Sequence, residues 1–458
     1  MLSFIVTNKW FKAGYGESLR RFFAQNSVFE QILDFGHAPI FEDADTFPCI
    51  VVARSLETKL EPEIAKLSPD FSVRVCPVPR EKLEDINLSQ FVQQEGFDLP
   101  WSRFTADAWS LEPSAVEELM QKIKAVGVPL KDFAGISPLY GTKTGFNEAF
   151  VIDRETRNEL IKQDNRATEI IKPFLRGQDI NRWNPQHADQ WMIYTTNEVN
   201  LDSFPAIERH LAKYREKLEA RAGKQKWWQL QGVTGSYILF EKPKIIYQVI
   251  QFLPQYAFDD SGLYGNDKTY FLPTADLYLL GLLNSPLVWW HNWRYFGHMK
   301  DEALNPANYK MESLSIAPPT DEIRSQVEPI VTHLIEITKA NQEANREVQD
   351  WLQVEQHIEK LGQKLEDFSR LDCDLFVQEV KIRKPKGLTL NPKALKELRE
   401  VYNDYAPHIQ TRRAEALAIE IQLSDLINEA YGLTPEEIDL MWKTAPPRMP
   451  IPNPTRRA

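Results

Sequence analysis

The sequence holds 458 residues, 43% hydrophobic and 11% aromatic, which is enough for about three globular domains of roughly 100 to 200 residues each. Its three cysteines form no Cys-x-x-Cys pair, its eight histidines lack ligand spacing and no long apolar run occurs, so disulfides, a metal site and a membrane span are not expected, and a reducing cytoplasm fits best. The formal net charge of −11 argues against a nucleic-acid partner only if the basic residues are evenly spread.

Residues 1–56 alternate between strand and helix signals. The runs at 3–7, 29–36 and 47–55 are predicted strands, and residues 15–26 are a predicted helix with apolar residues at helical spacing. We interpret the run at 3–7 as a buried strand, and the run at 47–55 is almost continuously apolar, as in a sheet covered on both faces. An isolated edge of such a sheet would leave apolar surface uncovered, so we expect an upstream partner or domain to complete it.

The rest of the chain changes composition three times. Residues 57–131 are acidic and punctuated by proline and are expected to be a connector with a helix at 113–127. Residues 132–319 are expected to form a mixed α+β domain, residues 320–445 a helical region and residues 446–458 a flexible proline-rich tail. Predicted strands of the α+β domain lie at 147–153, 191–196, 237–241, 244–250 and 268–272.

The helical region contains two long amphipathic stretches, at 322–371 and 392–431. A short helix is predicted at 434–443, where Thr434 and Glu437 have the spacing of a capping box. Asp374, Glu379 and Lys381 imitate the acidic set of a nuclease, but they fall on one helical stretch, so we predict no nuclease site there.

A cluster of basic residues runs from 209 to 226 with only Glu216 and Glu219 between them. Such a local cluster can bind phosphates even on an acidic chain, although a solvated helix face is an equally good interpretation. The cluster consists of Arg209, Lys213, Arg215, Lys217, Arg221, Lys224 and Lys226.

The opening FIVTNKWFKAGYGESLRRFF (4–23), followed by ILDFGHAPIFEDADTFPCIVVARS (32–55), resembles the later part of the catalytic domain of TaqI-like adenine-N6 DNA methyltransferases. A flipped adenine leaves its stack and needs a replacement aromatic face. The resemblance implies that Phe41 stacks on the extruded base. The alternative is that Phe41 is an ordinary core residue.

A second resemblance covers nearly two hundred residues, through GISPLYGTKTGFNEAFVID (135–153), IIKPFLRGQDINRW (170–183) and LLGLLNSPLVWWHNWRYFG (279–297). These segments resemble the TaqI-like target-recognition domain and also the specificity subunits of type I restriction systems. The residues after position 320 resemble the spacer and C-terminal helices that follow such domains in large restriction-modification methylases.

The recognition-domain resemblance, together with the chemistry of the side chains, suggests a set of DNA contacts. Lys143 and Thr144 can donate to phosphate oxygens, and Asn147 lies in the same glycine-containing loop. Arg176, Gln178 and Arg182 are suited to phosphates or base edges, unless they merely form a surface turn that closes a hairpin. The predicted DNA-binding residues are Lys143, Thr144, Asn147, Arg176, Gln178, Arg182, Lys213, Arg215, Lys217, Arg221, Lys224 and Lys226.

The motifs that bind the methyl donor and the target amine in this class are not found. Gly14-Tyr15-Gly16 is a lone G-x-G, and Ser137-Pro138-Leu139-Tyr140 lacks the second proline of the catalytic loop, so neither carries a site. No catalytic residue is therefore predicted. The resemblance implies S-adenosylmethionine for the complete enzyme, and we expect this chain alone to bind none and to be inactive.

These observations predict an α/β remnant that carries the last strands of a methyltransferase sheet, an α+β DNA target-recognition domain and a helical C-terminal region. The predicted function is recognition of double-stranded DNA and positioning of an adenine for N6 methylation in a restriction-modification (type IIG-like) or phage-defence system. The predicted partner is an upstream methyltransferase half that carries the missing motifs. Two alternatives remain: a non-catalytic DNA specificity subunit, and a degraded gene product without activity.

Overall fold

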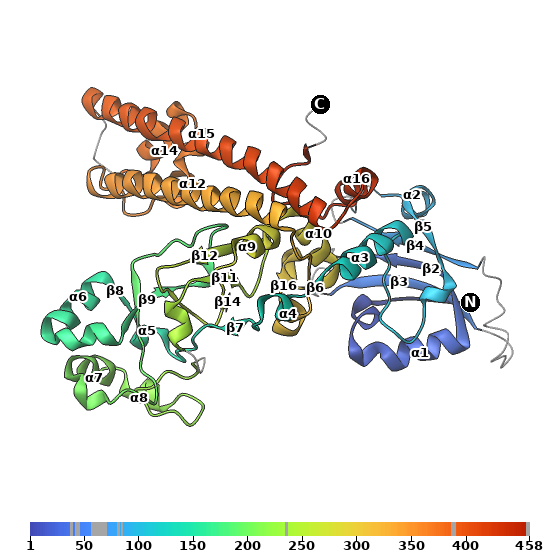
Figure 1. Ribbon diagram of the computed structural model, residues 1–458, viewed down its shortest axis with the longest axis horizontal. Helices are drawn as coiled ribbons and strands as arrows, with labels where there is room; N and C mark the ends of the chain where they lie inside the picture. The colour runs from blue at the N-terminus through green and yellow to red at the C-terminus, as the bar shows by residue number, and fades with distance from the viewer. Residues whose placement is uncertain are drawn as a thin grey trace. The chain divides into compact units, whose positions relative to one another are not determined.

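The computed structural model describes residues 1–36, 40–41, 46–55, 71–79, 83, 86–233, 237–385 and 391–454. The chain divides into two compact units. The N-terminal unit consists of Met1–Ala125, His298–Ala303 and Asp439–Thr444, and the main unit consists of the other residues. Figure 1 traces the elements of both units along the chain. In the described residues no helix is both long enough and apolar enough to cross a membrane.

The N-terminal unit is built on a five-stranded sheet of strand order β1-β3-β2-β4-β5. Strands β2 and β4 are parallel and the other neighbours are antiparallel. Its helices are α1 (Glu17–Asn26), α2 (Leu88–Glu95) and α3 (Ser114–Val126). The strands are β1 (Leu2–Thr7), β2 (Ser27–Asp34), β3 (Pro48–Ser55), β4 (Ser72–Pro77) and β5 (Phe97–Pro100).

Two features of this sheet differ from the sequence-based expectation. Strands β4 and β5 belong to the stretch expected to be a connector, so the sheet continues well past residue 56. Strand β1 was expected to be buried, yet all six of its residues are exposed. An apolar run identifies a strand, but it cannot show whether other elements cover the strand, and β1 lies at the edge of the sheet.

The main unit begins with two four-stranded sheets, of strand orders β13-β9-β10-β8 and β12-β11-β14-β7. Apolar side chains of both sheets, including Phe174, Ile246 and Phe271, share one buried core. The strands are β7 (Leu139–Tyr140), β8 (Val151–Asp153), β9 (Ile171–Leu175), β10 (Gln190–Ile193), β11 (Lys244–Gln248), β12 (Tyr256–Asp259), β13 (Tyr264–Gly265) and β14 (Thr269–Leu272).

Short elements connect and flank these sheets. The predicted strand at 237–241 is a 3-10 helix, and the predicted strand at 147–153 begins as the helical turn α5. The short helices are α4 (Leu130–Ala134), α5 (Asn147–Phe150), α6 (Arg154–Gln163), α7 (Pro205–Ala212), α8 (Arg215–Glu219), α9 (Leu277–Leu283), α10 (Pro286–Tyr295) and α11 (Asn308–Glu312). The remaining short strands are β6 (Val128–Pro129), β15 (Gly297–His298), β16 (Leu304–Asn305) and β17 (Ser315–Ile316).

Two long helices, α12 (Asp321–Val354) and α15 (Pro392–Ala430), run side by side in the C-terminal region (Figure 1). The Asn391 side chain caps α15 by accepting a bond from the amide of Ala394 at 2.9 Å. Helix α12 stops at Val354, whereas the sequence predicted a single stretch to residue 371. Backbone φ values of 56° at His357 and 69° at Gly362 reverse the chain before α13 (Gly362–Glu366), which is followed by α14 (Cys373–Arg383).

The last elements contain one confirmed and one wrong prediction. Helix α16 (Pro435–Lys443) starts with the predicted capping box, in which Thr434 and Glu437 exchange backbone-to-side-chain bonds of 2.7 and 3.3 Å. The residues after it were expected to form a flexible tail. Instead, Ile451 is buried, and the carbonyl of Arg448 accepts a 2.7 Å bond from the indole of Trp289, because the tail carries apolar residues that fit the main unit.

The buried pair of Lys244 and Asp259 predicts a strong stability effect. Both side chains are fully buried and hydrogen-bonded to one another, and burial lowers the pKa of Lys244. Asp259→Ala leaves the ammonium group buried without its partner and should lower the free energy of unfolding by about 3 to 5 kcal/mol. Chemical denaturation followed by circular dichroism measures this loss; a loss below about 1 kcal/mol would contradict it.

Candidate nucleic-acid interface

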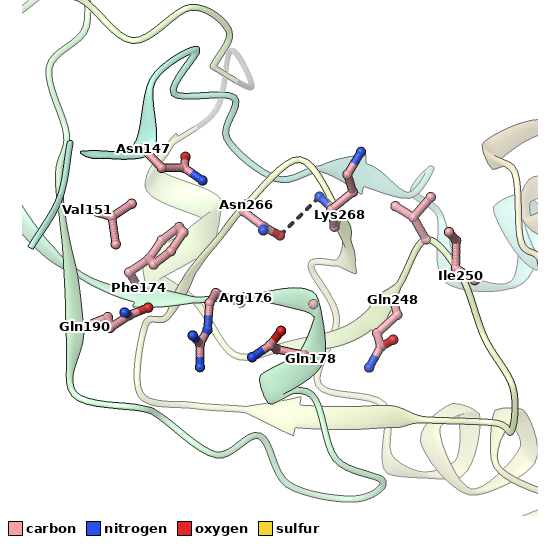
Figure 2. Close-up of a pocket in the computed structure, with 12 residues that line it drawn as sticks. Asn147, Val151, Phe174, Arg176, Gln178, Gln190, Gln248, Ile250, Asn266 and Lys268 are labelled. Carbon is pink, nitrogen blue, oxygen red and sulfur yellow. Dashed lines mark hydrogen bonds between the residues drawn. The ribbon is translucent and has the colours of Figure 1, made fainter. Parts of the chain in front are cut away.

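A cleft of about 440 Å³ lies between the two four-stranded sheets of the main unit. Polar side chains surround it, as Figure 2 shows, and they come from the turn after β9, from β10, β11 and α5, and from the turn between β13 and β14. The described residues that line it include no carboxylate; they are Asn147, Val151, Phe174, Arg176, Gly177, Gln178, Gln190, Gln248, Val249, Ile250, Asn266 and Lys268. The cleft is therefore rich in amides and carries positive charge at its wall.

Three of the predicted DNA contacts line this cleft: Asn147, Arg176 and Gln178. Gln178 is exposed. The guanidinium of Arg176 donates to both carboxylate oxygens of Asp179, at 2.8 and 2.7 Å, and this bond raises the pKa of Arg176. The carboxylate of Asp179 thus occupies the two guanidinium donors that a bidentate hydrogen bond to a guanine edge would use.

Four further polar residues of the cleft were missed by the sequence analysis: Gln190, Gln248, Asn266 and Lys268. The Lys268 side chain is 67% exposed and forms a long ion pair with Asp267, at 3.7 Å. The Oε1 atom of Gln190 is buried and has no hydrogen-bond partner within the described part of the chain. Single amides between apolar strand residues give no sequence signal, because only the pairing of strands brings them together.

The glycine-containing loop at 141–147 contributes Asn147 to the lining of the cleft. A β-carbon at Gly141 would lie 1.9 Å from the carbonyl oxygen of Asn266, so only glycine permits this close approach. Lys143 is exposed, whereas Thr144 is buried and donates its hydroxyl to the Asn147 side chain at 2.5 Å. Thr144 therefore fixes the loop with the hydroxyl that was predicted to donate to phosphate.

The basic cluster lies on α7, α8 and the segment that follows them. Lys213, Lys217, Lys224 and Lys226 are exposed. Arg215 is also exposed, but it forms an ion pair with Glu219 at 2.7 Å and lies 5.0 Å from the centre of the Trp227 ring. The contacts of these four lysines with phosphates remain a prediction.

Arg221 has a different role from its neighbours. Its guanidinium donates to the backbone carbonyls of Leu218, Thr144, Trp227 and Gln229, at 3.0, 2.7, 2.7 and 2.9 Å. Burial lowers its pKa. Arg221 therefore holds the basic segment against the loop at Thr144, with its donors turned to the protein.

Arg182 also points inward. It forms an ion pair with Glu420 of α15 at 2.9 Å and donates to the carbonyl of Asn284 at 2.7 Å. Burial lowers the pKa of Arg182, and only 18% of its side chain is exposed. This geometry gives Arg182 a contact with the helical region.

Phe41 follows strand β2 in the N-terminal unit and is 44% exposed. The alternative interpretation placed it in the core beside Ile40. The structure puts Ile40 against a buried cluster of β2, β4 and α2, and Phe41 outside it. Its role in stacking remains a prediction.

The second glycine of the Gly14-Tyr15-Gly16 turn packs closely against groups of the protein itself. A β-carbon at Gly16 would lie 2.2 Å from the carbonyl oxygen of Trp10 and 2.8 Å from the guanidinium of Arg20. The buried Arg20 side chain also donates to the carbonyl of Ala13 at 2.9 Å. The protein's own groups therefore fill the space beside Gly16, whereas an added β-carbon at Gly14 would meet nothing within 4 Å.

The two acidic residues that imitate a nuclease site are engaged in ion pairs. Asp374 pairs with Arg399 at 3.2 Å, and Glu379 pairs with Lys364. Among the residues that the structure describes, no three potential ligands of the His, Cys, Asp and Glu types come together as a metal site.

Comparison with known families assigns three parts of the chain. Residues 1–41 match the Eco57I restriction-modification methylase, and residues 172–316 match the TaqI-like C-terminal specificity domain. Residues 320–427 match a domain of unknown function, DUF8810. The resemblances to a restriction-modification methylase and to the TaqI-like specificity domain are thereby confirmed over the matched residues.

Individual relatives belong to the same class. The chain is similar to the type II methyltransferase M.BstVI of Geobacillus stearothermophilus, with 19% identity over 72% of this chain and 60% of the relative. It is also similar to M.PaeR7I of Pseudomonas aeruginosa, with 23% identity over 60% of this chain and 47% of the relative. The chain thus spans about half of the length of these relatives.

A solved structure shares the fold. The type IIL restriction-modification enzyme MmeI, determined in complex with DNA, matches with a TM-score of 0.50 and 12% identity. The match covers 96% of this chain and 49% of that chain. The mixed α/β architecture with several sheets and a helical C-terminal region is thus also found in a restriction-modification enzyme.

The buried and the exposed cations of the basic cluster should differ in how strongly their removal affects the free energy of unfolding. Arg221→Ala leaves four backbone carbonyls without their donor and should lower the free energy of unfolding by about 2 kcal/mol or more. Lys217→Ala and Lys224→Ala, on the same segment, should stay within about 0.5 kcal/mol of the parent protein because both side chains are exposed. Equal effects of the three changes in thermal melting would refute this assignment.

Proposed function

We propose that this chain recognises a sequence in double-stranded DNA and positions the target adenine for S-adenosylmethionine-dependent N6 methylation in a restriction-modification or phage-defence system of the cytoplasm. The observation that carries the proposal is the amide-rich cleft of the main unit, whose described lining holds no carboxylate and two cations. It lies largely within the residues that match a specificity domain. Amide groups pair with adenine edges, and the lack of acidic groups leaves the cleft open to a polyanion.

In this proposal the residues of the cleft and the exposed lysines of the basic cluster have different roles. The cleft reads base edges, because its amides can both donate and accept hydrogen bonds. The exposed lysines at 213, 217, 224 and 226 contact phosphates, which fixes the register of the protein on the duplex without reading its sequence.

The methyl donor belongs to another part of the complete enzyme in this proposal. The N-terminal unit exposes Phe4 and Ile5 of the edge strand β1 and Phe22 of α1, each by 50% or more. Apolar surface on a sheet edge suits a partner or a further domain that extends the sheet. We propose that this partner carries the donor site and the catalytic loop. The alternative of a specificity subunit without catalysis requires no such extension.

Selection from a random DNA library tests the proposal directly. The purified chain should enrich one short sequence motif, and the motif should contain an adenine. A mixture with a methyltransferase half that carries the donor motifs should then methylate that adenine. Enrichment without methylation by any such half would favour the specificity subunit, and no enrichment at low salt would refute DNA recognition.

The lysine cluster predicts a salt-dependent contribution to affinity. Reversing Lys217 and Lys224 to Glu should weaken binding to all duplexes alike and reduce the slope of log affinity against log salt, since each neutralised phosphate contributes about 0.9 to that slope. Lys393→Glu with Lys396→Glu, on the exposed start of α15, changes the net charge equally and serves as the control. Titrations by fluorescence anisotropy at several salt concentrations decide the outcome; equal losses for both pairs would mean that only the net charge matters.

We expect that removing the Phe41 ring impairs base flipping without lowering the stability of the protein. Phe41→Ala removes an exposed ring, so thermal melting should not change, whereas stacking of the extruded base should weaken by about 1 to 3 kcal/mol. Phe41→Trp should retain most of that stacking. Methylation by the reconstituted enzyme and the fluorescence of 2-aminopurine at the target position measure the effect. A large fall in melting temperature with flipping intact would assign Phe41 to the core.

A further inference from the structure

The segment between β9 and β10 connects two residues of the cleft. We call residues 176–190 the recognition loop; it carries Gln178 near its start and Gln190 at its end. Within it, Trp183 and Asp189 have φ values of 76° and 50°. Residues other than glycine adopt this left-handed conformation at a cost, and they keep it only where surrounding contacts enforce it.

The first of these contacts comes from α15. The carboxylate of Glu420 accepts a bond from the indole nitrogen of Trp183 at 2.7 Å and pairs with Arg182 at 2.9 Å. Only 11% of the Glu420 side chain is exposed. One buried carboxylate therefore holds two successive residues of the recognition loop, and one of them is in the left-handed conformation.

The second contact comes from α12 and is reciprocal. The side-chain amide of Asn184 donates to the Oε1 atom of Gln342 at 2.6 Å, and the Gln342 amide donates back to the carbonyl of Asn184 at 3.0 Å. Two bonds in opposite directions fix both the position and the rotation of this part of the backbone.

The third contact also comes from α12, at the end of the recognition loop. Arg346 forms an ion pair with Asp189, which receives a second one from Arg154 at 2.7 Å. Burial acts to raise the pKa of Asp189, but the two guanidinium groups outweigh it and hold that pKa below its ordinary value. Asp189 directly precedes Gln190, so this contact lies next to a cleft residue.

We infer that the paired helices α12 and α15 position the recognition loop for base reading, and that Glu420, Gln342 and Arg346 are positioning residues for sequence discrimination. The inference rests on the proposed function and gives the 320–427 region a role within it. All three residues lie in that region, and each holds the loop between Gln178 and Gln190. Hydrogen bonds to base edges depend on direction, so a shifted loop loses discrimination while phosphate contacts elsewhere keep the general affinity.

Gln342→Ala and Arg346→Ala test this inference on the full chain. Each should lower the ratio of affinities for the selected motif and a scrambled duplex by about tenfold, the lower part of the range for one base contact. Affinity for the scrambled duplex should stay within about twofold. Arg346→Lys keeps the charge beside Asp189 and should recover part of the discrimination. Arg399→Ala, which removes an exposed ion pair of α15 with Asp374, is the matched control and should leave the ratio unchanged.

The outcomes separate positioning from general stability. Glu420→Gln keeps an acceptor for Trp183 but removes the charge beside the buried Arg182, so we expect it to destabilise the fold. Gln342→Ala removes no charge, so its effect on discrimination can be measured on a folded protein. Folded Gln342→Ala and Arg346→Ala proteins with the parental ratio would overturn the inference and leave the proposed function intact. If the parent chain itself fails to prefer any motif, the proposed function falls and this inference falls with it.

Discussion

A guanidinium group that leaves water must keep its hydrogen bonds, to a carboxylate or to backbone carbonyls, and the arrangement of the main unit depends on how its arginines meet this requirement. Arg182 is paired with Glu420, Arg176 with Asp179, and Arg221 with four backbone carbonyls. Each of these arginines was a candidate DNA contact. Arg182 and Arg221 connect distant segments of this protein, whereas Arg176 pairs within its own turn and still lines the cleft. The groups that face a ligand are therefore the amides, the exposed lysines and the partly occupied guanidinium of Arg176.

This division has a chemical consequence for the cleft. Amides are neutral, so they can line a cleft without repelling one another and without a buried counter-ion. Gln178 and Gln248 therefore need no acidic partner in the wall, and a wall without carboxylates suits a polyanion. An arginine in the same wall needs a carboxylate nearby, as Arg176 shows, and that carboxylate competes with the ligand for the guanidinium.

The sequence could predict whatever depends on neighbours in the chain. The helix at 392–430 and the capping box of Thr434 and Glu437 were predicted because their signals lie within a few residues. The inward orientation of Arg182 could not be predicted, because its partner Glu420 lies far along the chain, 237 positions after Trp183, which Glu420 also binds. Gln178 and Asn147 were suggested because each lies in a local sequence pattern. Gln190, Gln248 and Lys268 were missed because only the pairing of distant strands brings them to the cleft.

The distribution of charge in the chain also follows from this architecture. Carboxylates on the helical region and in the recognition loop, such as Glu420 and Asp189, are neutralised by arginine partners, and neither lines the cleft. The exposed lysines between positions 213 and 226 have few such partners. The chain is acidic overall but positive at the basic cluster. Its electrostatic field therefore attracts a polyanion to that segment and orients it there, without giving high affinity over the rest of the surface. In the proposed function, weak general affinity with an oriented approach would leave sequence discrimination to the cleft.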